Sequence, residues 1–85
     1  MADARIEDRI KDMIVDRFML SIKPAEIGDE DDLLEKWDLE SVHLMEIVIG
    51  LEEVFGIQLG DDEFSMKKFR TVKNIAGVVR GKGVE

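Results

Sequence analysis

Ser41 is the residue of this 85-residue chain with the clearest chemical potential, because its hydroxyl stands at the head of the most apolar segment. A serine acts as a nucleophile when a base lies within hydrogen-bond reach. The only histidine, His43, is two residues further on, and on a helix it would point about 160° away from the serine. A serine-based active site within this chain is therefore not expected. Either Ser41 caps a helix, or a second protein activates it.

Residues 41–55 are predicted to form an amphipathic helix with two apolar arcs. The wider arc is an ordinary core stripe, made of Leu44, Ile47, Val48, Leu51, Val54 and Phe55. The second arc lies about 150° from it on a helical wheel and consists of Val42, Met45 and Ile49, here called the outer strip. Three carboxylates border the outer strip, namely Glu46, Glu52 and Glu53. Such a surface is expected to dock a basic partner with an apolar pocket, unless another helix covers it.

Acidic residues are concentrated around this helix. The whole chain has 20 Asp and Glu against 12 Lys and Arg, and a formal charge of −8. Between residues 37 and 66 there are eight acidic residues and no Lys or Arg. Nucleic acid is therefore not an expected partner, because phosphate binding needs a cationic surface, whereas basic protein surfaces are complementary. The charged N-terminal segment and the lack of a long apolar run predict a cytoplasmic protein that binds no membrane. We also expect a monomer.

The remaining elements are short and helical, so the chain is predicted to be one all-α domain over residues 1–85. We expect a small four-helix bundle with a long loop between the first and second helices and a short third helix. The expected helices cover residues 3–20, 41–55, 62–69 and 72–80, followed by a frayed tail at 81–85.

Local signals mark the ends and the inner faces of these helices. Gly56 is expected to end the second helix in a left-handed conformation, Asp61–Glu63 to open the third, and Thr71 to cap the last. In the first and last helices the side chains expected to face the core are Ile6, Ile10, Met13, Ile14, Phe18, Val72, Ile75, Ala76 and Val79. In the long loop, the residues expected to pin it to the bundle are Ile27, Leu33, Leu34, Trp37 and Leu39.

The segment from Ser41 to Phe55 resembles the second helix of acyl carrier proteins. In that family an Asp-Ser-Leu motif opens an acidic amphipathic helix that ends in Glu-Glu-x-Phe. Here ESV stands at the opening and EEVF at the end, at the family's spacing. The similarity continues through the acidic start of the third helix and the Thr71–Val72 opening of the last helix, so it covers essentially the whole chain.

This resemblance implies a non-catalytic carrier. Ser41 would bear 4′-phosphopantetheine, attached from coenzyme A through a phosphodiester by a phosphopantetheinyl transferase, and acyl groups would travel as thioesters on its thiol. The absence of cysteine fits a thiol that arrives on this arm. Glu40, in place of the motif's Asp, would join the outer strip and its carboxylates in recognising acyl-loading, condensing and acyl-transfer enzymes. The residues that would line an acyl cavity are Leu44, Val48, Leu51 and Ile75.

The chain departs from the family pattern around the serine. Glu40 replaces Asp, Val42 replaces Leu, and His43 stands where many fatty-acid carriers have an acid. These changes indicate a specialised carrier rather than the housekeeping fatty-acid protein. Fatty-acid, polyketide and aminoacyl cargo all stay open.

Two other interpretations share part of this pattern. An unmodified helical adaptor would use the same acidic surface and leave Ser41 unchanged. A calcium site is suggested by Asp29, Asp31 and Glu40, but an EF-hand loop needs an oxygen ligand and a glycine where Leu33 and Leu34 stand. We therefore expect no metal site.

Overall fold

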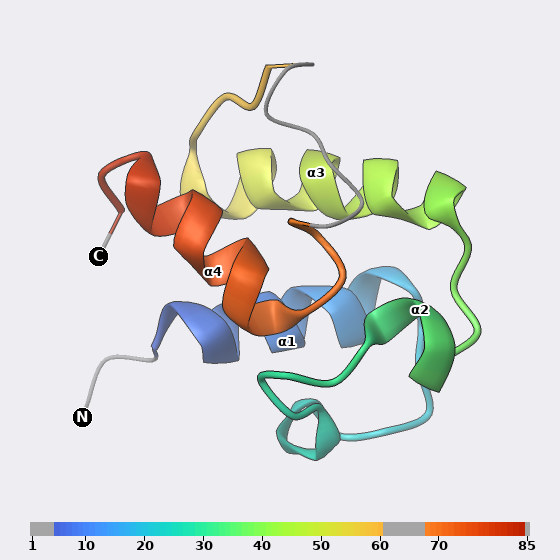
Figure 1. The fold of residues 1–85 in the computed structure, drawn as a ribbon. Coiled ribbons are helices and arrows are strands. Elements are labelled where there is room, and N and C mark those ends of the chain that lie inside the picture. Colours follow the sequence, from blue (N-terminus) through green and yellow to red (C-terminus); the bar gives the residue numbers. More distant parts are fainter. Residues whose placement is uncertain (1–4, 61–67, 85) are drawn as a thin grey trace.

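Helices are the only regular secondary structure in the part of the chain that the structure describes. This computed structural model describes residues 5–60 and 68–84, with Ser41 described by its backbone alone. The elements are α1 (Ile6–Arg17), the 3₁₀ helix η1 (Pro24–Glu26), α2 (Leu33–Lys36), α3 (Ser41–Phe55) and α4 (Val72–Gly81). No strand occurs among these residues (Figure 1), which confirms the predicted all-α class. None of the described helices has the length and apolarity to cross a membrane.

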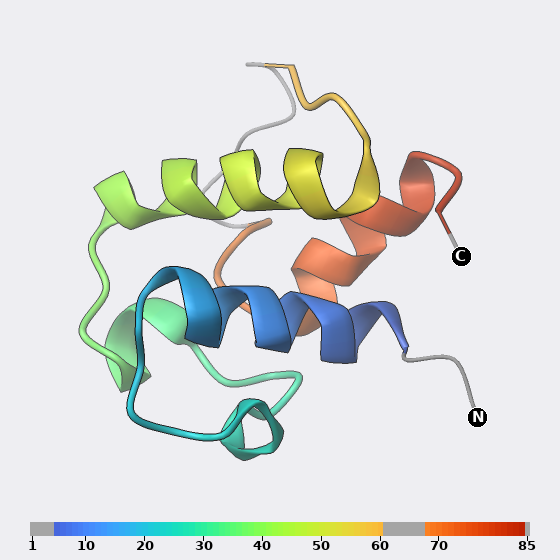
Figure 2. The same ribbon diagram turned by 180° about the vertical axis from the view of Figure 1, so that it is seen from behind.

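α1 is the element against which α3, α4 and η1 all pack. Its buried apolar residues recur at helical spacing, at Ile6, Ile10, Met13 and Ile14. α1 and α3 run in opposite directions, and α4 crosses them obliquely (Figures 1 and 2). α1 is shorter than the expected 3–20. Residues 3 and 4 lie outside the described part, and the helix ends at Arg17 because Met19 has a left-handed backbone with φ of 52°.

The ends of α3 and α4 follow the predicted signals. Gly56 closes α3 with φ of 65°, and its N–H donates to the Glu52 carbonyl oxygen at 2.9 Å. Glycine adopts this conformation without strain because it has no Cβ. Thr71 caps α4, since its hydroxyl oxygen accepts from the Asn74 N–H at 3.1 Å. Both predicted caps are confirmed.

One apolar core joins α1, α3, α4 and the loop before α3. Its fully buried side chains from the two later helices are Leu44, Ile47, Leu51, Val72, Ile75, Ala76 and Val79. The prediction for Val54 is wrong, because this residue is 40% exposed and lines an open groove between α1 and α3. The stripe on the helical wheel is wider than the face that the neighbouring helices cover. Phe55 is half-buried, and the Arg9 guanidinium lies 4.4 Å from its ring centroid.

The connection between α1 and α3 contains two elements that are not among the predicted helices, η1 and α2. Asp32 caps α2 by accepting from the N–H groups of Leu34 and Glu35 at 3.0 and 3.2 Å. The spacing of Asp32 and Glu35 is a known helix-start signal that could have revealed it. Arg70 donates to the other Asp32 oxygen at 3.0 and 2.7 Å and so ties the loop to the start of α4. Mainly through these bonds, the pKa of Asp32 lies below its usual value.

Apolar side chains pin this loop to the core as predicted. Ile27 and Leu33 are buried, and the side chains packed less completely against the core are Leu34, Trp37 and Leu39. The short helix expected at 62–69, with its start at Asp61–Glu63, lies mostly outside the described residues. Its last two positions, 68 and 69, are described as a turn.

Candidate cofactor-attachment site

Ser41 is the first helical residue of α3 and not its cap. The N-cap position belongs to Glu40, whose backbone is extended with φ of −105° and ψ of 167°. The interpretation in which Ser41 caps the helix is therefore wrong. At this end of a helix, free N–H groups and the helix dipole favour a bound anion. The first turn of α3 carries no acidic side chain, so the residues present fit a phosphate attached at Ser41.

His43 holds the turn that contains Ser41. Its Nδ1 accepts from the Glu40 N–H at 2.8 Å, and its own N–H donates to the Glu40 carbonyl oxygen at 2.8 Å. The Nδ1 bond is the half of a capping box in which the N3 side chain accepts from the N-cap N–H, with histidine in the place usually taken by Glu or Gln. The imidazole also packs edge-on against Phe18 of the α1 end, with ring centroids 5.6 Å apart. Because Nδ1 accepts from the backbone, His43 acts here as a structural residue.

The outer strip lies open on the surface of α3. Val42 is 64% exposed, Met45 48% and Ile49 39%. The alternative in which another helix covers these residues is therefore wrong. Large apolar side chains gathered on one exposed helix face are typical of a surface that a partner covers.

The carboxylates around the outer strip differ in how they are held. Glu46 and Glu53 share one cation, Arg17 of α1, with Nε 3.1 Å from Glu46 Oε1 and Nη1 3.3 Å from Glu53 Oε1. These bonds raise the pKa of Arg17, with the Glu46 hydrogen bond as the largest cause. Glu52 accepts from the Leu59 N–H at 2.9 Å and so braces the segment that follows α3. Glu40 is exposed beside Ser41.

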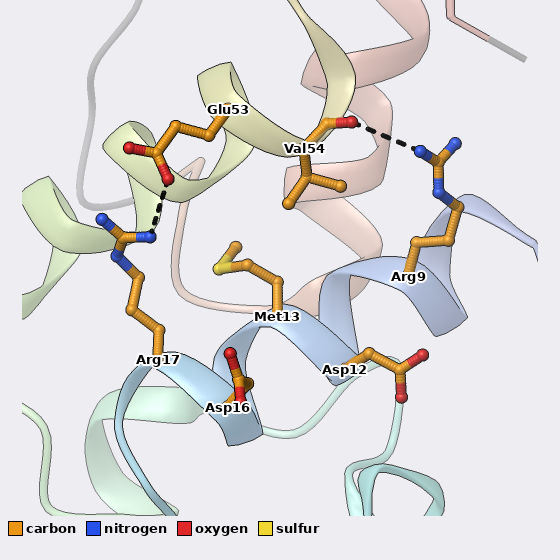
Figure 3. A pocket seen from close by; sticks show the side chains of 7 residues that line it. All are labelled: Arg9, Asp12, Met13, Asp16, Arg17, Glu53 and Val54. Atoms are coloured by element: carbon orange, nitrogen blue, oxygen red, sulfur yellow. Dashed lines mark hydrogen bonds and ion pairs between the residues drawn. The ribbon is translucent and has the colours of Figure 1, made fainter.

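Arg17 is a residue of this site that the sequence pattern did not reveal. The stretch 37–66 has no Lys or Arg, yet in space a cation from another helix enters the acidic surface. Figure 3 shows Arg17 and Glu53 reaching toward each other across a groove of about 480 Å³ between α1 and α3. The groove is lined by Arg9, Asp12, Met13, Asp16, Arg17, Glu53 and Val54. No spacing rule links residues 29 and 36 positions apart.

The four predicted acyl-cavity residues come together in the core. Leu44, Val48 and Leu51 of α3 are buried in the same cluster as Ile75 of α4. They therefore belong to the one apolar core that joins α1, α3 and α4.

The acidic residues of the calcium alternative are engaged by other groups. Asp29 is paired with Lys11 at 2.6 Å and with Arg5 at 3.6 Å. Asp31 accepts from the Gly28 N–H at 2.7 Å and pairs with Lys36 at 3.2 Å. Over residues 5–60 and 68–84, no group of three or more His, Asp or Glu side chains is arranged to hold a metal ion.

Comparison with known proteins agrees with this geometry. Residues 8–79 match the family model described as the phosphopantetheine attachment site. An acyl carrier protein 2 of Ralstonia nicotianae is 32% identical over 80 residues, covering 94% of each chain. The acyl carrier protein of Lactobacillus acidophilus is 29% identical over 80 residues, covering 94% of this chain and 95% of its own.

A solved structure shows the same fold. The solution structure of a holo acyl carrier protein from Nitrosomonas europaea superposes with a TM-score of 0.80 and covers 93% of this chain and 96% of its own, at 24% identity. At that identity the likeness concerns the fold alone. The family match spans most of the chain, including the whole of α3, and together the two comparisons lead to one assignment. The chain belongs to the acyl carrier protein family, whose members are carriers with a covalent phosphopantetheine group rather than catalysts.

Proposed function

We propose that Ser41 is the attachment residue and that this protein carries acyl groups as thioesters on the thiol of its phosphopantetheine arm. The observation that carries the proposal is the position of Ser41. It opens α3 at the anion-favouring end of the helix, within the matched residues 8–79, and the exposed outer strip begins at the next residue. A flexible arm at this point lets one cargo visit several enzymes at high effective concentration.

The outer strip and its carboxylates form the proposed docking surface. Its partners are a phosphopantetheinyl transferase and the acyl-loading, condensing and acyl-transfer enzymes of fatty-acid, polyketide or related biosynthesis. Exposed carboxylates attract basic patches at long range, and the charge pairs that form are weak enough to release quickly. The residues proposed to contact partners are Glu40, Val42, Met45, Glu46, Ile49, Glu52 and Glu53.

The core between α3 and α4 is the proposed place for the acyl chain. Leu44, Val48, Leu51 and Ile75 present only apolar side chains there, and an alkyl chain gains about 0.8 kcal/mol per buried CH₂ group. We also propose that the protein is a cytoplasmic monomer. The capping role of His43, at a position where many fatty-acid carriers have an acid, favours a specialised pathway.

Intact-mass measurement tests the proposal. The protein is incubated with coenzyme A and a phosphopantetheinyl transferase, and we expect wild type to gain one phosphopantetheinyl group. Ser41→Ala should gain none, whereas Ser21→Ala should be modified like wild type, because Ser21 lies exposed in the loop after α1. Modification of the Ser41→Ala variant would rule out Ser41 as the attachment residue. A wild-type protein that stays unmodified with its own host's transferase would favour the adaptor interpretation.

A further inference from the structure

The docking surface contains an internal cation. Arg17 stands in the last turn of α1, and its guanidinium bridges Glu46 and Glu53, which lie about two turns apart on α3. A basic partner that approaches the outer strip therefore meets two carboxylates that already have a cation of their own. Figure 3 shows the Arg17 side chain rising from α1 toward Glu53 at the edge of the α1–α3 groove.

The Arg17 side chain passes close to a glycine of α3. Gly50 lies between Glu46 and Glu53 in sequence, and a Cβ added there would stand 2.6 Å from Met13 Sδ and 3.3 Å from Arg17 Cδ. The first distance is shorter than the contacts that Cβ atoms make in proteins, so a side chain at position 50 would displace Met13 Sδ and push the Arg17 stem slightly aside. The bare backbone at Gly50 thus lets two α1 side chains lie close against α3.

The bridge contributes little to folding. The side chain of Arg17 is 27% exposed and those of Glu46 and Glu53 are 52% and 66% exposed, and such surface ion pairs add at most about 1 kcal/mol to the stability of a protein. The packing of α1 on α3 rests instead on buried apolar residues such as Ile10 and Leu51. The Arg17 bridge therefore adds little to stability, yet it occupies two carboxylates of the docking surface. We expect its main effect to be on the binding of partners.

We infer that Arg17 is a specificity-determining residue of the docking surface, an internal competitor for the cations of basic partners. A partner that relies on Glu46 and Glu53 must displace Arg17, whereas a partner that relies on the apolar outer strip need not. Arg17 thereby weakens binding to partners selected by charge alone and favours those with an apolar pocket. This inference rests on the proposed function, because it assumes that partners dock on this surface.

The rate of Ser41 modification by a basic phosphopantetheinyl transferase measures this competition. We compare kcat/KM for wild type and Arg17→Met, which keeps an apolar stem and removes the charge. We expect Arg17→Met to be modified roughly two- to five-fold faster at low salt, with a gain that shrinks as salt screens the freed carboxylates. Lys36→Met is the matched control. This substitution also removes one exposed cation, because Lys36 of α2 pairs at 3.2 Å with Asp31 of the preceding loop. It should change the rate less.

A double-mutant cycle separates the bridge from net charge. In a background with both Glu46→Gln and Glu53→Gln, Arg17→Met should no longer speed modification, because there are no carboxylates left to free. If Arg17→Met loses its helical circular-dichroism signal, Arg17→Lys replaces it in the cycle and should give an intermediate rate, since lysine lacks the planar fork.

The possible failures are distinguishable. A wild-type protein that gains no phosphopantetheinyl group contradicts the proposed function, and the inference falls with it. Two results would overturn the inference alone, provided that wild type is modified normally. In one, Arg17→Met is modified no faster than Lys36→Met. In the other, Arg17→Met speeds modification as much in the background with Glu46→Gln and Glu53→Gln as it does in wild type.

Discussion

The two faces of α3 use the same kinds of residue for opposite purposes. On the inner face Leu44, Ile47 and Leu51 are fully buried against α1 and α4, whereas on the outer face Val42 and Met45 stand in solvent. Burial of an apolar side chain stabilises the fold, and an exposed one contributes nothing until a partner covers it. The same 15-residue helix therefore holds the domain together on one side and presents a docking surface on the other.

The charged residues show the same division. Glu7 of α1 is 12% exposed and accepts two hydrogen bonds from Arg80 of α4, at 2.8 and 2.9 Å. Glu46 and Glu53, by contrast, are mostly exposed and share the single cation of Arg17. A shielded carboxylate that accepts two hydrogen bonds from one guanidinium group is held firmly, whereas an exposed carboxylate exchanges its partner easily. The Glu7–Arg80 pair thus helps to hold α1 and α4 together, whereas the Arg17 bridge is part of the docking surface.

The largest expected effect separates the two faces of α3 directly. Leu51→Ala should lower the free energy of unfolding by about 2–5 kcal/mol, because it leaves a cavity in the core. Met45→Ala, a truncation of similar size on the outer face, should change it by less than about 0.5 kcal/mol. Urea denaturation followed by circular dichroism measures both. In the modification assay, Met45→Ala should slow the reaction of a protein that remains fully folded.

Equal losses of stability in these two variants would break the comparison. Such a result would mean that the outer strip is packed in solution, in contrast to its exposure in the structure. An unchanged modification rate for Met45→Ala would separately remove Met45 from the docking surface.

The next effect concerns the charge pair of the fold and depends on pH. Chiefly through the hydrogen bonds from Arg80, the pKa of Glu7 is lowered from 4.5 to about 2. A carboxylate with a lowered pKa stabilises the fold at pH values above its unfolded pKa, and this contribution is lost as the pH falls toward the folded pKa. Glu7→Gln should therefore cost about 1 kcal/mol at neutral pH, and the difference from wild type should fade between about pH 4.5 and pH 2.

Glu30→Gln is the control for this titration. Its carboxylate is 80% exposed and lies 3.8 Å from Lys73, so the same substitution should leave stability within about 0.5 kcal/mol of wild type at every pH. A Glu7→Gln deficit that persists unchanged down to pH 2 would contradict the role of the ionised pair and point to packing instead.

Local patterns of the sequence predicted α1, α3 and α4, whereas α2 was not predicted and the contacts between helices depend on long-range geometry. The 3.6-residue periodicity and the end signals at Gly56 and Thr71 predicted where α3 ends and α4 begins, because these signals act within a few residues. Val54 was misplaced because periodicity does not tell how wide a face the neighbours cover. The bonds Arg17–Glu53 and Arg80–Glu7 join residues 36 and 73 positions apart, and no local pattern encodes them.

The smallest expected effect concerns the N-terminal end of α3, where Ser41 lies. His43→Ala removes the acceptor of the Glu40 N–H and should cost about 0.5–1 kcal/mol, as the loss of a helix cap does. The amide of Glu40 should then exchange its hydrogen faster, and by a larger factor than the amides of α4, which respond only to the loss of overall stability. His43→Gln should restore slow exchange, because a glutamine at this position of a capping box can accept the same bond. If the Glu40 amide exchanges equally slowly in all three proteins, the 2.8 Å bond to Nδ1 does not hold the turn that contains Ser41, and the case for His43 as its support fails.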